Sequence, residues 1–263
     1  MSAPSTWIKR HRLSTRLWHW ANAAVLALML MSGLMIFNAH PRLYWGEYGA
    51  NFDSPWLEIG AIGDRGALSL GGRVIDTTGV LGVSSGADGA PAAVAFPGWA
   101  TIPSTYNLAD ARLWHLGMAP VLVGLLLWYL AWSVWNGHLR RDLLLHDGEW
   151  KPGHVTRDLL DHLRLRFGSG ERYNVLQKLA YLAVLVGLLP LVVVTGLAMA
   201  PGMDAAWPWL TELFGGRQSA RSVHFLCASG LVLFFVVHIV MVVLAGPLRE
   251  VRAMVTGWWR VRT

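Results

Sequence analysis

The chain has 263 residues, of which 54% are hydrophobic and only 14% are charged, whereas a soluble globular domain carries about 25% charged residues. The formal net charge is +6, and the 15 Trp favour a membrane protein with aromatic belts. The single Cys excludes a disulfide framework, an iron–sulfur cluster and CxxCH attachment of a prosthetic group within this chain. Because the basic residues sort by loop rather than forming a patch on a soluble fold, we expect no nucleic-acid binding.

The first apolar stretch follows a basic flank of Lys9, Arg10, Arg12 and Arg16, as a signal peptide would. It extends over about twenty residues, which is longer than a signal-peptide core, and no A-x-A cleavage site follows closely. The sequence therefore predicts a retained transmembrane helix over about residues 17–38.

A long loop over residues 39–112 separates this helix from the next apolar stretch. Loops of such length are usually functional or disordered, and the Trp and Tyr content of this one argues against disorder. Short strands are expected at Arg73–Val83 and Ala92–Phe96. We expect the loop to form a small cap on the periplasmic side.

Three further stretches, at about 113–135, 175–199 and 223–246, are long enough to cross a hydrocarbon core of ~30 Å, which requires about 20 residues. Pro120 and Pro190 lie inside two of them, which transmembrane helices tolerate. A cytoplasmic loop over 136–174 is expected to hold a short amphipathic helix within 140–172. The sequence predicts an all-α integral membrane protein, with four transmembrane helices forming one domain over residues 1–263.

Lysine and arginine residues predict the orientation in the membrane. Sixteen of the 22 lie in the N-terminal flank, around the 136–174 loop and in the C-terminal tail, and six lie in the other segments. The positive-inside rule then places both termini in the cytoplasm, in a bacterial inner membrane.

Four of the ten histidines fall inside the predicted spans, where an ionisable side chain is costly and marks a functional candidate. His224 and His238 are 14 residues apart, which on a helix is about 21 Å of rise and about 40° short of four full turns. They therefore share a face near opposite membrane surfaces. By depth, His19 matches His238 and His115 matches His224, so each pair can ligate a six-coordinate haem suited to electron transfer.

Two kinds of residue near these histidines have alternative interpretations. The glycines either let a flat macrocycle approach the backbone or serve ordinary helix packing; they are Gly33, Gly117, Gly196 and Gly230. The arginines either pair with haem propionates or extend to the membrane interface; they are Arg12, Arg16, Arg112 and Arg221.

The motifs TRLWHW at Thr15–Trp20 and RLWH at Arg112–His115, with the histidine pair spaced by 14, resemble the bacterial cytochrome b561 family. That family includes the cytochrome b subunits of nickel–iron hydrogenases and of formate dehydrogenases. The resemblance implies two haem b groups with the ligand pairs given above. It also implies a quinone pocket, because Tyr173-Asn174 and Gln177-Lys178 are similar to the YN…QK stretch of formate dehydrogenase subunits. Asn174 is then the candidate quinone residue, or alternatively a helix cap.

The long loop weighs against a hydrogenase partner, because it is short in the hydrogenase and formate dehydrogenase subunits. The segments HPRLYWGEYG, GHLRRDLL, YNVLQKLAY and GRQSARSVHF resemble instead the subgroup that accompanies periplasmic molybdopterin oxidoreductases. The leading hypothesis is an electron-transfer subunit between such a periplasmic partner and the quinone pool, embedded in lipid; the sequence is compatible with a homodimer.

Two other functions compete with this one. A stand-alone superoxide oxidase that reduces quinone would favour a cationic outer surface, but the outer segments carry six Lys/Arg against nine Asp/Glu. A membrane anchor or transporter without a cofactor would leave four intramembrane histidines unexplained.

Overall fold

The computed structural model describes residues 5–85, 89–146, 149, 153, 156–158, 160 and 174–262. Within this part of the chain, four apolar helical stretches are long enough to cross a membrane, at Leu13–Asn38, Leu108–Trp135, Val175–Met199 and Arg217–Ala245. The chain is therefore a multi-pass membrane protein of mostly helical architecture, as the sequence predicts.

Three of these stretches are single helices: α1 (Leu13–Asn38), α2 (Leu108–Trp135) and α8 (Arg217–Ala245). Each begins earlier than predicted from hydropathy. The first turns carry polar residues, such as Ser14 in α1 and Asp110 in α2, which lie outside the apolar stretch but still form helix.

The third span is interrupted near its middle. It consists of α4 (Val175–Leu182), a π-helical segment (Ala183–Leu188) and α5 (Leu189–Met199). Pro190 has no N–H to donate to the carbonyl of Val186, which lies within the π-helical segment. A π-helical turn absorbs such an irregularity without breaking the span.

The chain divides into two compact units, each built from separate segments. The terminal unit comprises Met1–Ala23, Gly124–Pro190 and Ser229–Thr263, and so contains both chain ends. The loop unit comprises Ala24–Val123 and Leu191–Ala228, and so contains the long loop.

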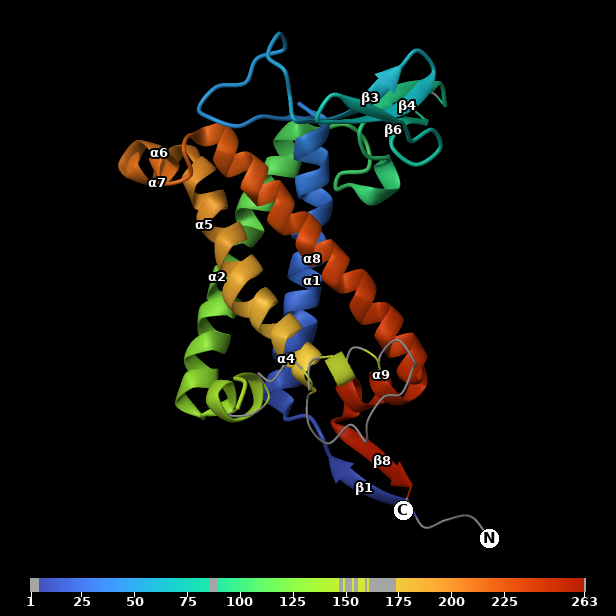
Figure 1. Cartoon of the computed structure of the whole chain (residues 1–263), viewed down its shortest axis with the longest axis vertical. Helices are drawn as coiled ribbons and strands as arrows, with labels where there is room; N and C mark the ends of the chain where they lie inside the picture. The colour runs from blue at the N-terminus through green and yellow to red at the C-terminus, as the bar shows by residue number, and fades with distance from the viewer. Residues whose placement is uncertain are drawn as a thin grey trace. The chain divides into compact units, whose positions relative to one another are not determined.

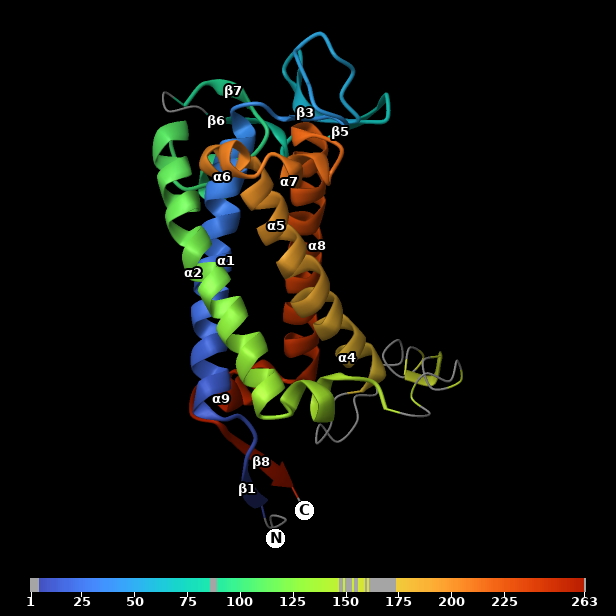
Figure 2. The same ribbon diagram turned by 90° about the vertical axis from the view of Figure 1, so that its left-hand side faces the viewer.

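The long loop carries two small antiparallel sheets, and Figure 2 labels β3 and β5 of one and β6 and β7 of the other. One sheet has the order β2 (Arg42–Leu43), β3 (Leu57–Ile62), β4 (Arg65–Leu70) and β5 (Arg73–Asp76), and the other pairs β6 (Gly82–Ser85) with β7 (Pro91–Val94). The strand predicted over 73–83 is therefore two strands, β5 and β6. A turn separates them, at which Gly79 has a φ of 84°, a value that glycine adopts readily.

The loop is fastened to the helices of its own unit by a buried cluster and by hydrogen bonds. Phe37, Leu43, Ile59 and Ala95 are buried together. Trp56 Nε1 donates to Ser222 Oγ on α8 at 2.9 Å, and this hydroxyl donates to the carbonyl of Tyr44 at 2.6 Å. The loop thus forms an ordered part of the loop unit.

Three short helices complete the loop unit. They are a 3₁₀ turn at Gly98–Ala100, α6 (Pro201–Ala206) and α7 (Trp209–Glu212). Ala198, Leu210 and Ala220 form a second buried cluster beside α7. The hydroxyl of Thr211 donates to the Ala198 carbonyl at 2.9 Å, which ties α7 to the end of α5.

The terminal unit joins the two chain ends. β1 (Ser5–Lys9) pairs antiparallel with β8 (Trp258–Arg262), and α9 (Pro247–Thr256) precedes β8. Figure 1 draws β1 and β8 side by side. In the same unit, Trp18 of α1 stacks on Tyr129 of α2 with ring centres 4.1 Å apart and donates from Nε1 to the Leu125 carbonyl at 2.9 Å.

After α2 the chain forms a short π-helical segment at Leu139–Leu143. The amphipathic helix predicted within 140–172 falls largely outside the described residues.

Candidate functional site

Two pairs of histidine rings each join two helices within one compact unit. In the loop unit, the ring centres of His115 on α2 and His224 on α8 are 6.2 Å apart, with planes inclined by 65°. In the terminal unit, the ring centres of His19 on α1 and His238 on α8 are 6.3 Å apart, with planes inclined by 54°. Each ring therefore has its predicted partner as a close neighbour.

The spacing of the rings fits a metal centre between the members of each pair. A first-row metal such as zinc bonds imidazole nitrogen at about 2.0–2.1 Å, so two imidazoles on opposite sides of one metal have centres roughly 6 Å apart. Among the described residues, no group of three or more His, Cys, Asp or Glu could hold a metal ion. Two imidazoles alone suit a metal whose other ligands belong to a cofactor, as in a haem.

The ring of His115 is oriented by two acceptors on α1. Its Nδ1 lies 3.1 Å from the Met29 carbonyl oxygen and 3.1 Å from Ser32 Oγ. Since a carbonyl oxygen only accepts, Nδ1 carries the proton. The Ser32 hydroxyl donates to the Leu28 carbonyl at 2.7 Å, which leaves its oxygen free to accept. Nε2 then keeps its lone pair, the form of imidazole that binds a metal.

The ring of His224 is oriented in the same way from α5. Its Nδ1 lies 3.0 Å from Thr195 Oγ1, and the Thr195 hydroxyl donates to the Leu191 carbonyl at 2.7 Å. The hydroxyl oxygen therefore accepts from Nδ1–H, and Nε2 of His224 is again the nitrogen with the lone pair.

A glycine follows each of these hydroxyl residues and meets the same ring. A Cβ on Gly33 would lie 3.3 Å from Cε1 of His115, and a Cβ on Gly196 would lie 3.4 Å from Cε1 of His224. These glycines thus admit the imidazole rings close to the helix backbone. Of the other two predicted glycines, Gly230 faces Leu188 and Gly117 faces open space.

The histidine pair of the terminal unit is held by different contacts. His238 stacks on Phe234, with ring centres 6.0 Å apart and planes inclined by 14°. Nδ1 of His19 is buried and has no hydrogen-bond partner among the described residues, and the same holds for Oδ1 of Asn22 one turn along α1. In the described part of the chain, no acceptor therefore fixes the tautomer of His19.

Arg16 and Arg112, both predicted near haem propionates, differ in their surroundings. Arg16 donates to the backbone carbonyls of Met254, at 3.3 Å, and Val255, near the end of α9. A cation at that position satisfies the free carbonyls of the last turn. Arg112 is exposed on the first turns of α2. Their role toward a propionate stays a prediction.

Arg221, the third of these arginines, joins α8 to the loop. Its guanidinium donates to the carbonyls of His40 and, at 2.9 Å, Arg42, and lies 5.6 Å from the ring centre of Phe37. It thus fixes the start of β2 to the helix that carries His224. A propionate contact from Arg221 also stays a prediction.

Asn174 caps α4. Its Oδ1 accepts from Gln177 N at 2.8 Å, while Gln177 Oε1 accepts from Asn174 N at 3.3 Å, which together form a capping box. Tyr173 lies outside the described residues. The capping interpretation accounts for the side-chain oxygen, and the quinone role of Asn174 stays a prediction.

From the sequence, the other six histidines are expected to be solvated or headgroup-facing and not to be ligands; they are His11, His40, His138, His146, His154 and His162. Of the described ones, His11 and His40 are partly buried. Burial, together with the charge of Arg10, lowers the pKa of His11 to about 4. Burial, Arg221 and Arg42 lower the pKa of His40, and none of the described residues forms a hydrogen bond with its buried Nε2. His154 and His162 lie outside the described residues.

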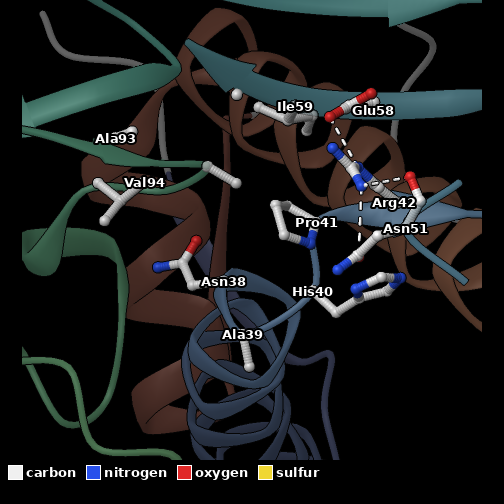
Figure 3. Close-up of a pocket in the computed structure, with 12 residues that line it drawn as sticks. Asn38, Ala39, His40, Pro41, Arg42, Asn51, Glu58, Ile59, Ala93 and Val94 are labelled. Atoms are coloured by element: carbon white, nitrogen blue, oxygen red, sulfur yellow. Dashed lines mark hydrogen bonds and ion pairs between the residues drawn. The ribbon is translucent and has the colours of Figure 1, made fainter.

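A hollow of about 490 Å³ lies elsewhere in the loop unit, beside β2 and β3 (Figure 3). Within it, Arg42 Nε donates to Glu58 Oε1 at 2.7 Å, and Arg42 Nη1 donates to Asn51 Oδ1 at 3.3 Å. None of the four paired histidines lines it. Because its charged groups bond to each other, we assign them a structural role.

Ser32 and Thr195 are the site residues that hydropathy and histidine spacing miss. Each precedes a glycine in an otherwise apolar span, as Ser32-Gly33 and Thr195-Gly196. The same hydroxyl–glycine dipeptide occurs as Ser229-Gly230 in α8, where the glycine faces Leu188, so this signal alone does not identify the two residues.

Comparison with known proteins gives two matches. Residues 10–257 match the family described as prokaryotic cytochrome b561. A putative protein-methionine-sulfoxide reductase subunit YedZ1 of Azospira oryzae is 32% identical over 152 residues, which cover 57% of this chain and 72% of that protein. No solved structure matches the chain.

Proposed function

Because the chain belongs to the prokaryotic cytochrome b561 family, we propose that it is a dihaem cytochrome that passes electrons between a periplasmic oxidoreductase and the quinone pool. At the level of the family, it is a membrane haem b protein of electron transfer. The observation that carries the finer proposal is the presence of two histidine pairs with ring centres 6.2 and 6.3 Å apart.

In this proposal His115 and His224 ligate one haem, and His19 and His238 ligate the other. A haem supplies a reversible one-electron couple, and axial coordination by two imidazoles leaves no open position for a substrate. The hydrogen bonds at Nδ1 of His115 and His224 place the proton on Nδ1, which would leave Nε2 available to the metal.

Membrane topology follows from the sequence and remains part of the proposal. The concentration of 16 of the 22 Lys and Arg in the termini and around the 136–174 loop supports cytoplasmic termini in an inner membrane. By sequence order, His19 and His238 then belong to the cytoplasmic ends of their spans, and His115 and His224 to the periplasmic ends.

The partner and the electron carrier are proposed from chemistry and likeness. The relative from Azospira oryzae is named as a subunit of a protein-methionine-sulfoxide reductase, which supports an oxidoreductase partner. The ordered sheets of the long loop offer a periplasmic surface for it, and the resemblance of the loop segments favours a molybdopterin enzyme. On the cytoplasmic side, quinone would exchange electrons with the His19–His238 haem near Asn174.

The test is reduction of the purified protein by a quinol analogue, followed at the haem absorption bands. We expect quinol to reduce both haems of the wild type. In His238→Ala the remaining haem should be reduced by dithionite but not by quinol, because its electron route is cut. His146→Ala, which changes an exposed histidine outside the spans, is the matched control and should behave as the wild type.

Two results would contradict the proposal. One is a wild-type protein with two haems that quinol does not reduce. The other is faster haem reduction by superoxide than by quinol, which would favour a stand-alone superoxide oxidase.

A further inference from the structure

Both histidines of the loop unit meet the same local arrangement, built on two different helices. On α1 a hydroxyl–glycine dipeptide, Ser32-Gly33, contacts His115, and on α5 the dipeptide Thr195-Gly196 contacts His224. In each case the hydroxyl faces Nδ1 and the glycine faces Cε1. The two arrangements are thus equivalent in atoms as well as in residue type.

We propose that Ser32 and Thr195 are positioning residues that hold His115 and His224 as Nδ1–H tautomers and thereby lower the midpoint potential of the haem between them. The inference rests on the proposed function, in which this pair ligates a haem. It assigns Ser32 and Thr195, which otherwise serve only helix packing, a role in setting the midpoint potential of the haem.

The direction of the two hydroxyl bonds supports this role. Each hydroxyl proton is already donated to the carbonyl four residues earlier, that of Leu28 or that of Leu191, at 2.7 Å. The oxygen therefore presents a lone pair, not a proton, to the histidine. A donor at this position would instead have stabilised the opposite tautomer, with the proton on Nε2, which cannot bind iron.

The intrahelical bond alone does not explain the arrangement. Serine and threonine often bond to the carbonyl four residues back in a helix, which satisfies the hydroxyl in a fully buried site. Both side chains are 0% exposed, and the adjacent glycines bring each ring close enough to use the remaining lone pair. If the hydroxyl served only the bond within its own helix, the histidine ring would not need to lie this close to it.

The expected effect on the haem has a definite sign. An acceptor at Nδ1–H makes the imidazole a stronger electron donor at Nε2, which stabilises the ferric state. Removal of the acceptor should therefore raise the midpoint potential. Thr195→Val and Ser32→Ala should have effects of similar size, because each ring keeps a backbone carbonyl as a second acceptor, that of Met29 for His115 at 3.1 Å and that of Val192 for His224.

The experiment is a redox titration of both haems in the wild type, Ser32→Ala, Thr195→Val and the double variant, with haem content measured alongside. Ser133→Ala removes a hydroxyl that is 1% exposed on α2, in the terminal unit, and serves as the control. We expect one potential to rise and the other to stay unchanged. Ser32→Thr and Thr195→Ser keep a hydroxyl and should keep the wild-type potential.

Two outcomes would overturn the inference without touching the proposed function. One is a double variant that retains two haems at unchanged potentials. The other is an equal shift or loss of haem in the hydroxyl-preserving variants, since side-chain volume would then be the cause. A wild type with fewer than two haems would instead overturn the proposed function itself.

Discussion

The two compact units hold their histidine pairs by different means. In the loop unit, Nδ1 of His115 and of His224 each meets a buried hydroxyl, and a glycine admits each ring. In the terminal unit, His238 is held by stacking on Phe234, and the buried Nδ1 of His19 has no hydrogen-bond partner within the described residues. Hydrogen bonds from the protein thus fix the tautomer and orientation of both rings in the loop unit. In the terminal unit, the tautomer and orientation of the rings depend more on the bound cofactor.

The surroundings of the pairs differ in the same sense. In the loop unit, Arg221 and Ser222 of α8 form hydrogen bonds with the long loop, and they precede His224 by three and two residues. The terminal unit instead relies on aromatic stacking and on the pairing of β1 with β8. The comparison teaches that two similar ring spacings can arise from unlike supporting structures.

The largest effect is expected from filling the glycine contact in the loop unit. Gly196→Val should displace the ring of His224, because a Cβ alone would already touch Cε1 at 3.4 Å and valine adds two methyl groups beyond it; overpacking of this kind costs about 1–3 kcal/mol. Haem content should fall from two to about one per chain.

The matched control for this change lies in the terminal unit. Gly230→Val places its Cβ 3.2 Å from the end of the Leu188 side chain, which can move. We expect both haems to remain, with a smaller loss of thermal stability. Equal haem loss in the two variants would remove the distinction between the units.

A smaller effect is expected from the bond that fastens the loop to α8. Ser222→Ala leaves the Trp56 indole N–H and the Tyr44 carbonyl without their partner in a buried place, which costs about 1–3 kcal/mol. We expect a lower unfolding temperature and faster proteolysis of the loop, with two haems retained. Unchanged proteolysis would show that the loop is held by other contacts.

The smallest effect concerns pH and the terminal unit. Burial raises the pKa of Glu250 above its ordinary value of 4.5, against the opposing charges of Arg10 and Arg249. The folded state therefore binds a proton more readily than the unfolded state, so this contribution to stability is present below pH 4.5 and is lost as pH rises through the folded pKa.

Glu250→Gln should remove this part of the pH dependence, an effect of less than about 1 kcal/mol for a partly exposed ion pair. The measurement is the unfolding temperature of wild type and variant between pH 4 and 7. A wild-type stability that falls more steeply toward acid than that of the variant would contradict the sign.

The sequence was sufficient for the spans because they depend on a local regularity, and the depth of each histidine in its span predicted which rings lie close together. Apolar length identifies a span, and a spacing of 14 residues places two side chains on one helix face. The first turns of α1, α2 and α8 were missed, since helix continues into polar residues that hydropathy leaves out.

The remaining features depend on contacts between residues distant in the chain. The pairing of Ser5–Lys9 with Trp258–Arg262 has no local signal. The hydroxyls of Ser32 and Thr195 are indistinguishable from packing residues until the histidine rings lie beside them. Contacts of this kind determine how a histidine ring is oriented, although the local sequence pattern is enough to identify the histidine as a candidate ligand.

The most direct test of the two-pair account is haem quantitation by the pyridine haemochrome method in single and double histidine variants. The wild type should contain two b haems per chain, and His224→Ala or His238→Ala about one. The double variant His115→Ala/His224→Ala, within one pair, should still contain about one, whereas His224→Ala/His238→Ala, across the pairs, should contain none. A within-pair double that loses both haems would contradict the assignment of the pairs.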